Sequence, residues 1–253
     1  MRKIIAAADI TENDIIVEIG PGKGVLTAAL AQSAKQVIAI EVDRDMLPFL
    51  DALKEKHRDI TIVRQDARTA IPELFETNGA LAKEPRYRVI ANIPYNLTSL
   101  LIRLFLEGVP RQPTDMILLI QKEVGERLCA KPGDMSLLAV SAQYFATTKI
   151  LFTVSRGSFS PPPKVESAVV HLRIRPPQER LNPEEERNFF RLVHAGFRAK
   201  RKTLARNCAD TFNIPVETIK ALLIKSNLPE KVRAEELFLE QWRGLLASMR
   251  GII

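Results

Sequence analysis

Residues 15–24 read Ile15-Ile16-Val17-Glu18-Ile19-Gly20-Pro21-Gly22-Lys23-Gly24. The apolar run 15–19 predicts a buried strand, and the apolar spacing of residues 25–32 predicts an amphipathic helix directly after the glycines. Glycines between a strand and a helix let a ligand approach the backbone closely, and the helix N-terminus adds positive potential. A dinucleotide-binding turn has glycine or alanine three residues after its second glycine, where this chain has Val25. The alternating glycines therefore favour S-adenosylmethionine over NAD as the ligand.

Apolar runs and helical periodicity alternate from residue 15 to about residue 124, which indicates β-α-β units and a parallel sheet. Two later β-rich runs flank a proline-rich loop, and we expect them to form an antiparallel pair at the sheet edge. The expected strands are 15–19, 36–41, 60–64, 88–91, 115–120, 149–154 and 165–173. The expected helices of this region are 25–32, 45–56, 97–106 and 136–146. We predict an α/β fold with a sheet of about seven strands.

A polar, proline-punctuated linker at residues 176–183 separates this region from a C-terminal part that is helical throughout. Asn182 is placed to cap the first of these helices, with Pro183 at its first position and Glu185 three residues after the cap. The expected helices are 184–197, 202–212, 216–226 and 234–249. We predict an S-adenosylmethionine-binding α/β domain over residues 1–180 and a small all-helical domain over residues 181–253, a candidate for binding RNA or the ribosome.

The composition describes a globular chain with an excess of positive charge. It has 253 residues, of which 46% are hydrophobic, and a net charge of +7. Clustered Lys and Arg gain free energy by releasing phosphate counterions, although charge alone does not distinguish RNA, DNA and an anionic surface. No apolar run approaches the roughly 20 residues that span a bilayer, and Asp9 ends the first apolar stretch too early for a signal peptide. We expect a cytoplasmic, monomeric protein with reduced thiols at Cys129 and Cys208.

Acidic residues follow the second and third expected strands. Glu41 lies about twenty residues beyond the glycines, where a carboxylate can accept hydrogen bonds from both ribose hydroxyls of a nucleoside. Asp66, in Gln65-Asp66-Ala67, is placed to accept from the adenine amino group of the cofactor, although an acid after a strand is also a common helix cap. The candidate cofactor-binding residues are Glu18, Gly20, Gly22, Gly24, Glu41, Asp66, Ala67 and Asn92.

Asn92-Ile93-Pro94-Tyr95 closes the fourth expected strand and points to chemistry on the exocyclic nitrogen of adenine. Such an amino group is a poor nucleophile because its lone pair is delocalised into the purine. Hydrogen bonds from it to the Asn92 side-chain oxygen and the Ile93 carbonyl would favour a pyramidal, nucleophilic geometry. Pro94 biases Ile93 toward an extended conformation, and Tyr95 can stack on the extruded base, an interaction worth about 1–3 kcal/mol. The alternative is a simple turn that ends a strand.

Phe159, just before a proline-stiffened loop, is the candidate for a second aromatic wall around the base, although a single Phe is more often a core residue. The candidate catalytic residues are thus Asn92, Ile93, Pro94, Tyr95 and Phe159. We expect no metal and no general base, because His57, His171 and His194 lie far apart in the sequence. Methyl transfer from a sulfonium by in-line displacement rests on proximity and orientation instead.

A basic cluster lies in the C-terminal helical part, between residues 197 and 206, without an intervening acid. A solvated face usually mixes charges of both signs, so we expect this cluster to contact RNA phosphates. The candidate RNA-binding residues are Arg198, Lys200, Arg201, Lys202 and Arg206.

Five motifs together resemble the ribosomal RNA adenine dimethyltransferase family, and the resemblance covers nearly the whole chain. The motifs are residues 18–24, 41–43, 65–67, 92–95 and 159–165. The resemblance implies a Rossmann-like, S-adenosylmethionine-dependent methyltransferase sheet over residues 1–180, followed by a small C-terminal all-helical domain. It also implies that Gly20, Glu41, Asp66 and Asn92 line the cofactor site. The target adenine would be held by Asn92, Tyr95 and Phe159.

Within the family, residues 159–169 and the tail motif 197–204 are most similar to the bacterial small-subunit group. The resemblance then implies transfer of methyl groups from S-adenosylmethionine to N6 of two adjacent adenines near the 3′ end of 16S rRNA in the assembling small ribosomal subunit. Two alternatives stay open: a 23S rRNA adenine methyltransferase of the macrolide-resistance type, and a non-catalytic RNA-binding assembly factor. Family members usually carry a Gln-Asn-Phe-Leu segment upstream of the first strand, whereas this chain starts after that position, so we expect this form to bind cofactor weakly.

Overall fold

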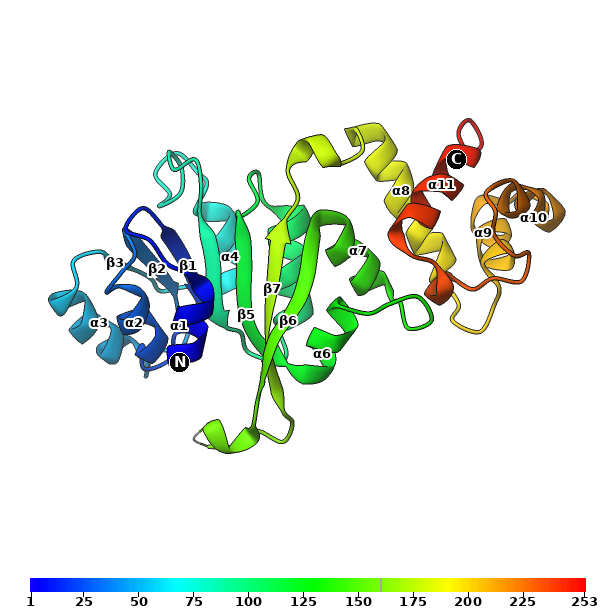
Figure 1. The fold of residues 1–253 in the computed structure, drawn as a ribbon. Helices are drawn as coiled ribbons and strands as arrows, with labels where there is room; N and C mark the ends of the chain where they lie inside the picture. Colours follow the sequence, from blue (N-terminus) through cyan, green and yellow to red (C-terminus); the bar gives the residue numbers. More distant parts are fainter. Residues whose placement is uncertain (160) are drawn as a thin grey trace. The chain divides into compact units, whose positions relative to one another are not determined.

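The computed structural model describes residues 1–159 and 161–253, which form two compact units (Figure 1). The first unit combines Met1–Gly125 with Thr147–Ile174, and the second combines Glu126–Ala146 with Arg175–Ile253. The unit boundary thus differs from the boundary expected at residue 180, because residues 126–146 belong to the second unit. Every helix in the described part of the chain is too short or too polar to cross a membrane.

A seven-stranded sheet in the order β3-β2-β1-β4-β5-β7-β6 organises the first unit. Its strands are β1 (Ile15–Ile19), β2 (Gln36–Ile40), β3 (Ile60–Val63), β4 (Arg88–Asn92), β5 (Asp115–Gln121), β6 (Ala146–Val154) and β7 (Ser167–Ile174). Strands β3, β2, β1, β4 and β5 are parallel to one another, whereas β7 pairs antiparallel with β5. The predicted α/β sheet of seven strands with a late antiparallel pair at its edge is confirmed.

Helices α1 (Arg2–Ala8) and α2 (Val25–Leu30) cover one face of this sheet. Ile4 of α1 and Leu26 and Leu30 of α2 lie in one buried cluster with side chains from five strands. The strand members of this cluster are Ile16, Val37, Ile90, Ile117, Leu119 and Val169. Full burial of a large aliphatic side chain contributes about 1.5–3 kcal/mol, so this cluster holds α2 firmly against the sheet. The glycine-rich segment before α2 is thereby fixed at the end of β1.

The second unit is helical and is built around aromatic side chains. Its helices are α7 (Leu137–Phe145), α8 (Pro183–Gly196), α9 (Leu204–Phe212), α10 (Val216–Lys225) and α11 (Leu239–Ser248). Tyr144 of α7 stacks on Phe189 of α8 with ring centroids 4.8 Å apart. A Cβ on Gly196 would lie 2.4 Å from the ring of Trp242, so glycine is required where α8 and α11 meet. The packing of α7 on α8 explains why residues 126–146 belong to this unit.

Several expected helix boundaries are wrong. Residues 234–249 do not form one helix: the turn η4 (Ala234–Glu236) is separated from α11 by the extended residues Leu237 and Phe238. Lys202 precedes α9, which begins after the Thr203 cap. The expected helix 97–106 becomes α5 (Thr98–Arg103) followed by the π-helical turn η1 (Leu104–Gly108). The remaining elements are α3 (Leu47–Lys56), α4 (Ala67–Glu73), α6 (Lys122–Leu128), η2 (Arg156–Ser158) and η3 (Pro177–Glu179).

Candidate active site

Four candidate site residues lie at one edge of the sheet because the strands that carry them run parallel. Gly20, Glu41 and Asp66 follow β1, β2 and β3, and Asn92 is the last residue of β4. Backbone hydrogen bonds tie the neighbouring strand ends together, from Gly20 N to Ile40 O at 3.0 Å and from Glu41 N to Val63 O at 2.9 Å. In open α/β sheets, ligands bind outside the carboxyl ends of the strands, and this edge is therefore the candidate active site.

The glycine-rich turn is shaped by two close approaches. Gly20 has a φ of +64°, and a Cβ there would lie 3.3 Å from the ring of Pro94. The turn after β1 therefore lies against the Asn92-Ile93-Pro94-Tyr95 turn after β4. Gly24 has a φ of +77°, and a Cβ there would lie 2.3 Å from Leu53 Cδ1. Only glycine fits this position without displacing α3, which accounts for the glycine directly before α2.

Glu18 lies in β1 beneath the turn and is completely buried. Burial raises the pKa of its carboxyl to about 8; the Thr27 hydroxyl opposes this shift, and the neighbouring Glu41 carboxylate adds to it. Its Oε2 has no hydrogen-bond partner among the described residues. A buried polar atom of this kind, one residue before the end of β1, fits a site that takes a polar or cationic ligand group.

Glu41 directs its carboxylate back onto the surrounding backbone. Its Oε1 accepts from the backbone N–H groups of Val42 and Asp43, each at 2.9 Å, and its Oε2 accepts from Gly22 N–H at 3.0 Å. A carboxylate has about four acceptor positions, so Oε2 has room for one further donor. Glu41 thus braces the glycine-rich turn from the end of β2 and retains one acceptor position for a ligand hydroxyl.

Asp66 caps α4 and is held by its neighbour Arg68. Asp66 Oδ1 accepts from Arg68 N at 2.8 Å and from Arg68 Nε at 2.9 Å, and Oδ2 accepts from Arg68 Nη2 at 2.7 Å. These hydrogen bonds with Arg68 lower the pKa of Asp66 to about 2. The cap role and the predicted cofactor role are compatible, because Oδ2 keeps a free lone pair. Ala67, the next residue, is buried in the first turn of α4.

The Asn92-Ile93-Pro94-Tyr95 turn is fixed at both ends. Asn92 pairs with Leu119 of β5 in the sheet register, and Ile93 N–H donates to Leu119 O at 3.2 Å. The turn then enters α5 through a hydrogen bond from Leu97 N–H to Pro94 O at 3.0 Å. The Tyr95 hydroxyl shares a hydrogen bond of 2.7 Å with the Ser167 hydroxyl of β7. Sequence periodicity does not identify Ser167, since nothing in the chain marks a partner 72 residues away.

Phe159 is half-buried and packs against the apolar cluster that contains Leu119 and Val169. Leu119, one member of this cluster, is the register partner of Asn92. The structure thus brings Gly20, Pro94 and the Asn92 strand end together directly, whereas Phe159 is joined to them through core side chains.

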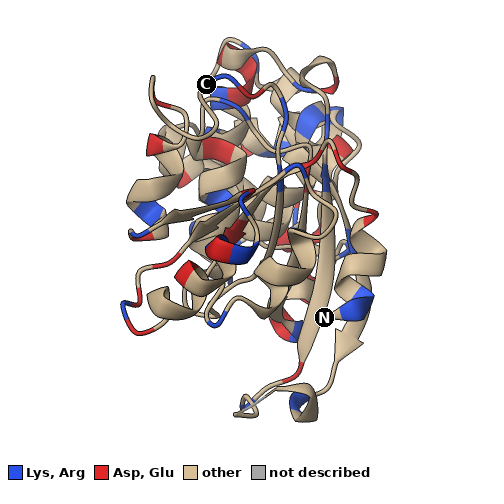
Figure 2. Ribbon diagram, turned by 90° about the vertical axis from the view of Figure 1, so that its left-hand side faces the viewer, with Lys and Arg blue, Asp and Glu red and all other residues tan. Residues whose placement is uncertain are grey.

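The predicted basic residues Arg198, Lys200, Arg201, Lys202 and Arg206 are all exposed in the second unit. Two of them are paired with an acid that the sequence did not indicate. Asp210 lies 2.9 Å from Lys202 Nζ and 3.3 Å from Arg206 Nε. Figure 2 likewise shows both charge signs close to the C-terminus. The helical geometry of α9 brings Asp210 beside Arg206, because residues four apart share a face, whereas Lys202 reaches Asp210 from the segment before the helix.

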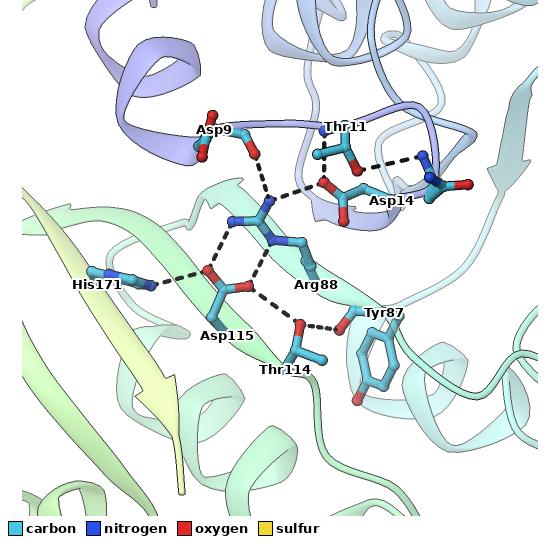
Figure 3. A network of polar contacts seen from close by, with 9 residues as sticks. Asp9, Thr11, Asp14, Tyr87, Arg88, Thr114, Asp115 and His171 are labelled. Carbon is cyan, nitrogen blue, oxygen red and sulfur yellow. Dashed lines mark hydrogen bonds and ion pairs between the residues drawn. The ribbon is translucent and has the colours of Figure 1, made fainter.

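The candidate residues at this edge of the sheet include no histidine. The described residues contain no group of three or more His, Cys, Asp or Glu side chains that could hold a metal ion. His171 instead belongs to a polar network with Asp115 and Arg88, shown in Figure 3. Arg88 and Asp115 are the first residues of β4 and β5, so this network lies at the opposite ends of those strands.

The strand order with an antiparallel β7, together with the glycine-rich turn and Glu41 beside it, defines a Rossmann-like methyltransferase domain. The ribosomal RNA adenine dimethylase family matches residues 1–247. The chain belongs to this family, as its motifs predict. Membership confirms the expected enzyme class, a ribosomal RNA methyltransferase, and implies S-adenosylmethionine as the methyl donor.

Individual relatives match this chain over nearly its whole length. Ribosomal RNA small subunit methyltransferase A of Dehalococcoides mccartyi is 37% identical over 254 residues, covering 99% of this chain and 84% of the relative. The protein of the same name from Pelotomaculum thermopropionicum is 40% identical and covers 97% of this chain and 85% of the relative. A crystal structure of a dimethyladenosine transferase from Plasmodium falciparum has a TM-score of 0.80 at 28% identity, over 99% of this chain and 95% of that chain. A 23S rRNA methyltransferase structure shares the fold, with a TM-score of 0.75 at 24% identity.

Proposed function

We propose that this chain transfers methyl groups from S-adenosylmethionine to N6 of two adjacent adenines near the 3′ end of 16S rRNA in the assembling small ribosomal subunit. The observation that carries the proposal is the contact between the glycine-rich turn and the asparagine turn, with Gly20 held against the Pro94 ring. A cofactor turn and an amino-group-binding turn must meet if a methyl group is to pass between them. The printed name shared by the bacterial relatives supports the small-subunit assignment.

The residues at the sheet edge fit the cofactor. When bound, S-adenosylmethionine supplies an electrophilic methyl group on a sulfonium. Gly20, Gly22 and Gly24 allow close approach to the backbone, and Glu18 offers a buried carboxyl oxygen without a partner. Glu41 can accept from one ribose hydroxyl through the remaining lone pair of Oε2. Binding of the second hydroxyl would require release of a backbone N–H, such as that of Gly22.

The adenine-binding face of the cofactor site is assigned to Asp66 and Ala67. The Asp66 carboxylate can accept from the adenine amino group of the cofactor while Arg68 holds its orientation. Asn92 completes this site at the end of β4. No metal is assigned a role in the reaction, because displacement at a methyl group on sulfonium needs positioning rather than Lewis-acid activation.

The target adenine is assigned to the asparagine turn. Asn92 Oδ1 and the Ile93 carbonyl accept hydrogen bonds from its N6 amino group and so favour the pyramidal nitrogen that attacks the methyl carbon. Pro94 holds Ile93 extended, and the Tyr95 and Phe159 rings flank the base. Stacking on an aromatic ring is worth about 1–3 kcal/mol, which offsets part of the cost of extruding the base.

The helical domain, residues 181–253, is assigned to RNA or ribosome contact. Arg198, Lys200 and Arg201 are exposed, but Asp210 forms ion pairs with Lys202 and Arg206 and also interacts electrostatically with Arg198. We therefore assign the phosphate contacts first to Lys200 and Arg201. Phosphate contacts of this kind position a protein without reading sequence. We assign the protein to the cytoplasm, where small subunits assemble, and to the monomeric state.

The experiment is methyl transfer to unmethylated 30S particles compared with naked 23S rRNA, with radiolabelled S-adenosylmethionine. Incorporation into 30S particles, lost in Asn92→Ala, is the expected result. Incorporation into 23S rRNA alone would assign the chain to the macrolide-resistance type. Absence of incorporation into either RNA, with retained binding to 30S particles, would support a non-catalytic assembly factor.

A further inference from the structure

Ser167 is the first residue of β7, and the direction of that strand places it at the active edge of the sheet. Because β7 runs antiparallel to β5, its beginning lies beside the end of β5, where Ser167 pairs in register with Gln121. Two residues earlier in β5, Leu119 pairs with Asn92 at the end of β4. The start of β7 and the asparagine turn at the end of β4 therefore lie on either side of the end of β5.

The Ser167 side chain is fully buried and is bonded to the hydroxyl of Tyr95 over 2.7 Å. A buried hydroxyl without a hydrogen-bond partner destabilises the folded protein by about 1–3 kcal/mol. The hydrogen bond therefore holds the two hydroxyls together. The position of the Tyr95 hydroxyl fixes the first side-chain torsion. Because a phenolic O–H prefers to lie in the plane of its ring, the hydrogen bond to Ser167 also favours the ring plane that contains the Ser167 hydroxyl. The face of the Tyr95 ring is thus set by a residue on a different strand.

The residue directly before Ser167 is itself anchored to the end of β5. Lys122 N–H donates to Glu166 O at 3.0 Å, and Lys122 Nζ forms an ion pair with Glu166 Oε2 at 2.9 Å. Ser167 follows the loop that carries Phe159 eight residues earlier. Ser167 is thus linked to both aromatic residues assigned to the target base. Its side chain bonds to Tyr95, and Phe159 precedes it in the sequence.

We propose that Ser167 is a positioning residue for the target adenine: its hydroxyl holds the Tyr95 ring in the plane on which the extruded base stacks. The inference rests on the proposed function, since it assigns Tyr95 to the target base. Ser167 does not touch the base; it acts through Tyr95. Its loss should therefore affect the methyl-transfer step and leave binding of the cofactor unchanged.

The test is a double-mutant cycle with Ser167→Ala, Tyr95→Phe and both together, measured as single-turnover methyl transfer to 30S particles. Each single variant should lower the rate about three- to tenfold, the range that one net hydrogen bond supplies. In the Tyr95→Phe background, Ser167→Ala should have no further effect, because the bond is already absent. S-adenosylmethionine affinity, measured by calorimetry, should stay within about twofold of the wild type in all three proteins.

Ser136→Ala is the matched control. Ser136 caps α7 in the second unit, where its hydroxyl accepts from Ala139 N–H at 3.2 Å. This variant loses one serine hydrogen bond as well, and it should lower thermal stability without lowering the single-turnover rate. A general effect of lost stability would instead lower the rate in both serine variants.

Independent, multiplicative losses in the double-mutant cycle would overturn the inference, as would a wild-type rate in Ser167→Ala. If Ser167→Ala does not fold, Tyr95→Phe alone decides the question, since it removes the same bond and keeps the ring. A wild-type rate in that variant contradicts the inference. Failure of the proposed function is distinguishable, because the wild-type protein would then methylate no small-subunit adenine.

Discussion

The polar network in Figure 3 predicts a large, pH-dependent loss of stability in Asp115→Asn. The Asp115 carboxylate accepts from Arg88 Nε at 2.7 Å and from Arg88 Nη2 at 2.8 Å, and it also accepts from His171 Nε2 at 3.0 Å. The Arg88 and Asp115 side chains are only 14% and 12% exposed. An amide in place of the carboxylate removes the charge and turns an N–H₂ group toward donors, so Arg88 keeps only Asp14 as an ionic partner, at 3.0 Å.

The pKa of Asp115 gives one measure of how much stability Asp115→Asn should lose. Burial raises this pKa, but the hydrogen bonds from His171 and Arg88 outweigh burial and lower it from 3.8 to about 2. At about 1.4 kcal/mol per pKa unit, this corresponds to about 2 kcal/mol of stability at neutral pH. Removing one partner of a buried pair costs about 3–5 kcal/mol. Because Asp14 still contacts Arg88, we expect the lower end, about 3 kcal/mol.

The sign of the pH dependence follows from the lowered pKa. A carboxyl whose pKa is lower in the folded state stabilises the protein fully above the unfolded-state pKa, and this contribution is lost as the pH falls through the folded-state pKa. Between pH 7 and pH 3, about half of the contribution of Asp115 should disappear. The difference between wild type and Asp115→Asn should therefore shrink over this range.

The assay is urea unfolding followed by circular dichroism at pH 7, 5 and 3. Glu217→Gln is the control, because it breaks the exposed pair of Glu217 with Lys220 and should not measurably change the unfolding midpoint. The reasoning would be refuted by a loss below about 1 kcal/mol in Asp115→Asn at pH 7, or by a loss that does not change between pH 7 and pH 3. Cofactor affinity should be unchanged, since the network lies at the opposite ends of the strands.

Three further predictions concern the active edge and the helical unit. Gly24→Ala places a Cβ 2.3 Å from Leu53 Cδ1 at a φ of +77°. The resulting backbone strain of about 1–2 kcal/mol should distort the glycine-rich turn and weaken S-adenosylmethionine binding about tenfold, as measured by calorimetry. The folded-state pKa of Glu18 is raised from 4.5 to about 8. The stability of the wild type should therefore fall as the pH rises from 4.5 to 8, and the melting temperature of Glu18→Gln should not show this pH dependence. Lys200→Ala and Arg201→Ala should each reduce the salt dependence of RNA binding by about one unit of slope in filter-binding titrations.

The sheet was predictable because its signals are local. Four apolar runs are followed by a glycine, an acid or an asparagine, and parallel strands place those endings at one edge without any knowledge of side-chain contacts. The candidate cofactor residues Gly20, Glu41 and Asp66 could therefore be located from order alone. Their partners could not: Glu41 binds the backbone of Gly22, and Asp66 binds Arg68.

Features that depend on distant packing were missed or placed wrongly. Residues 126–146 look continuous with the sheet domain in sequence, but Tyr144 stacks on Phe189 and draws them into the helical unit. The helix expected over residues 234–249 is broken at Leu237 and Phe238, although no proline or glycine marks the break. The contact between Tyr95 and Ser167 arises only when β7 pairs antiparallel with β5.

The most direct test of the central claim is mass spectrometry of adenines in 16S rRNA after reaction of unmethylated 30S particles with the wild-type protein and with Asn92→Ala. The assignment of N6 methyl transfer to the Asn92-Ile93-Pro94-Tyr95 turn predicts two adjacent N6,N6-dimethyladenines near the 3′ end with the wild type and unmodified adenines with the variant. Dimethylation by Asn92→Ala at the wild-type rate, or unmodified 16S adenines after reaction with the wild type, would contradict it.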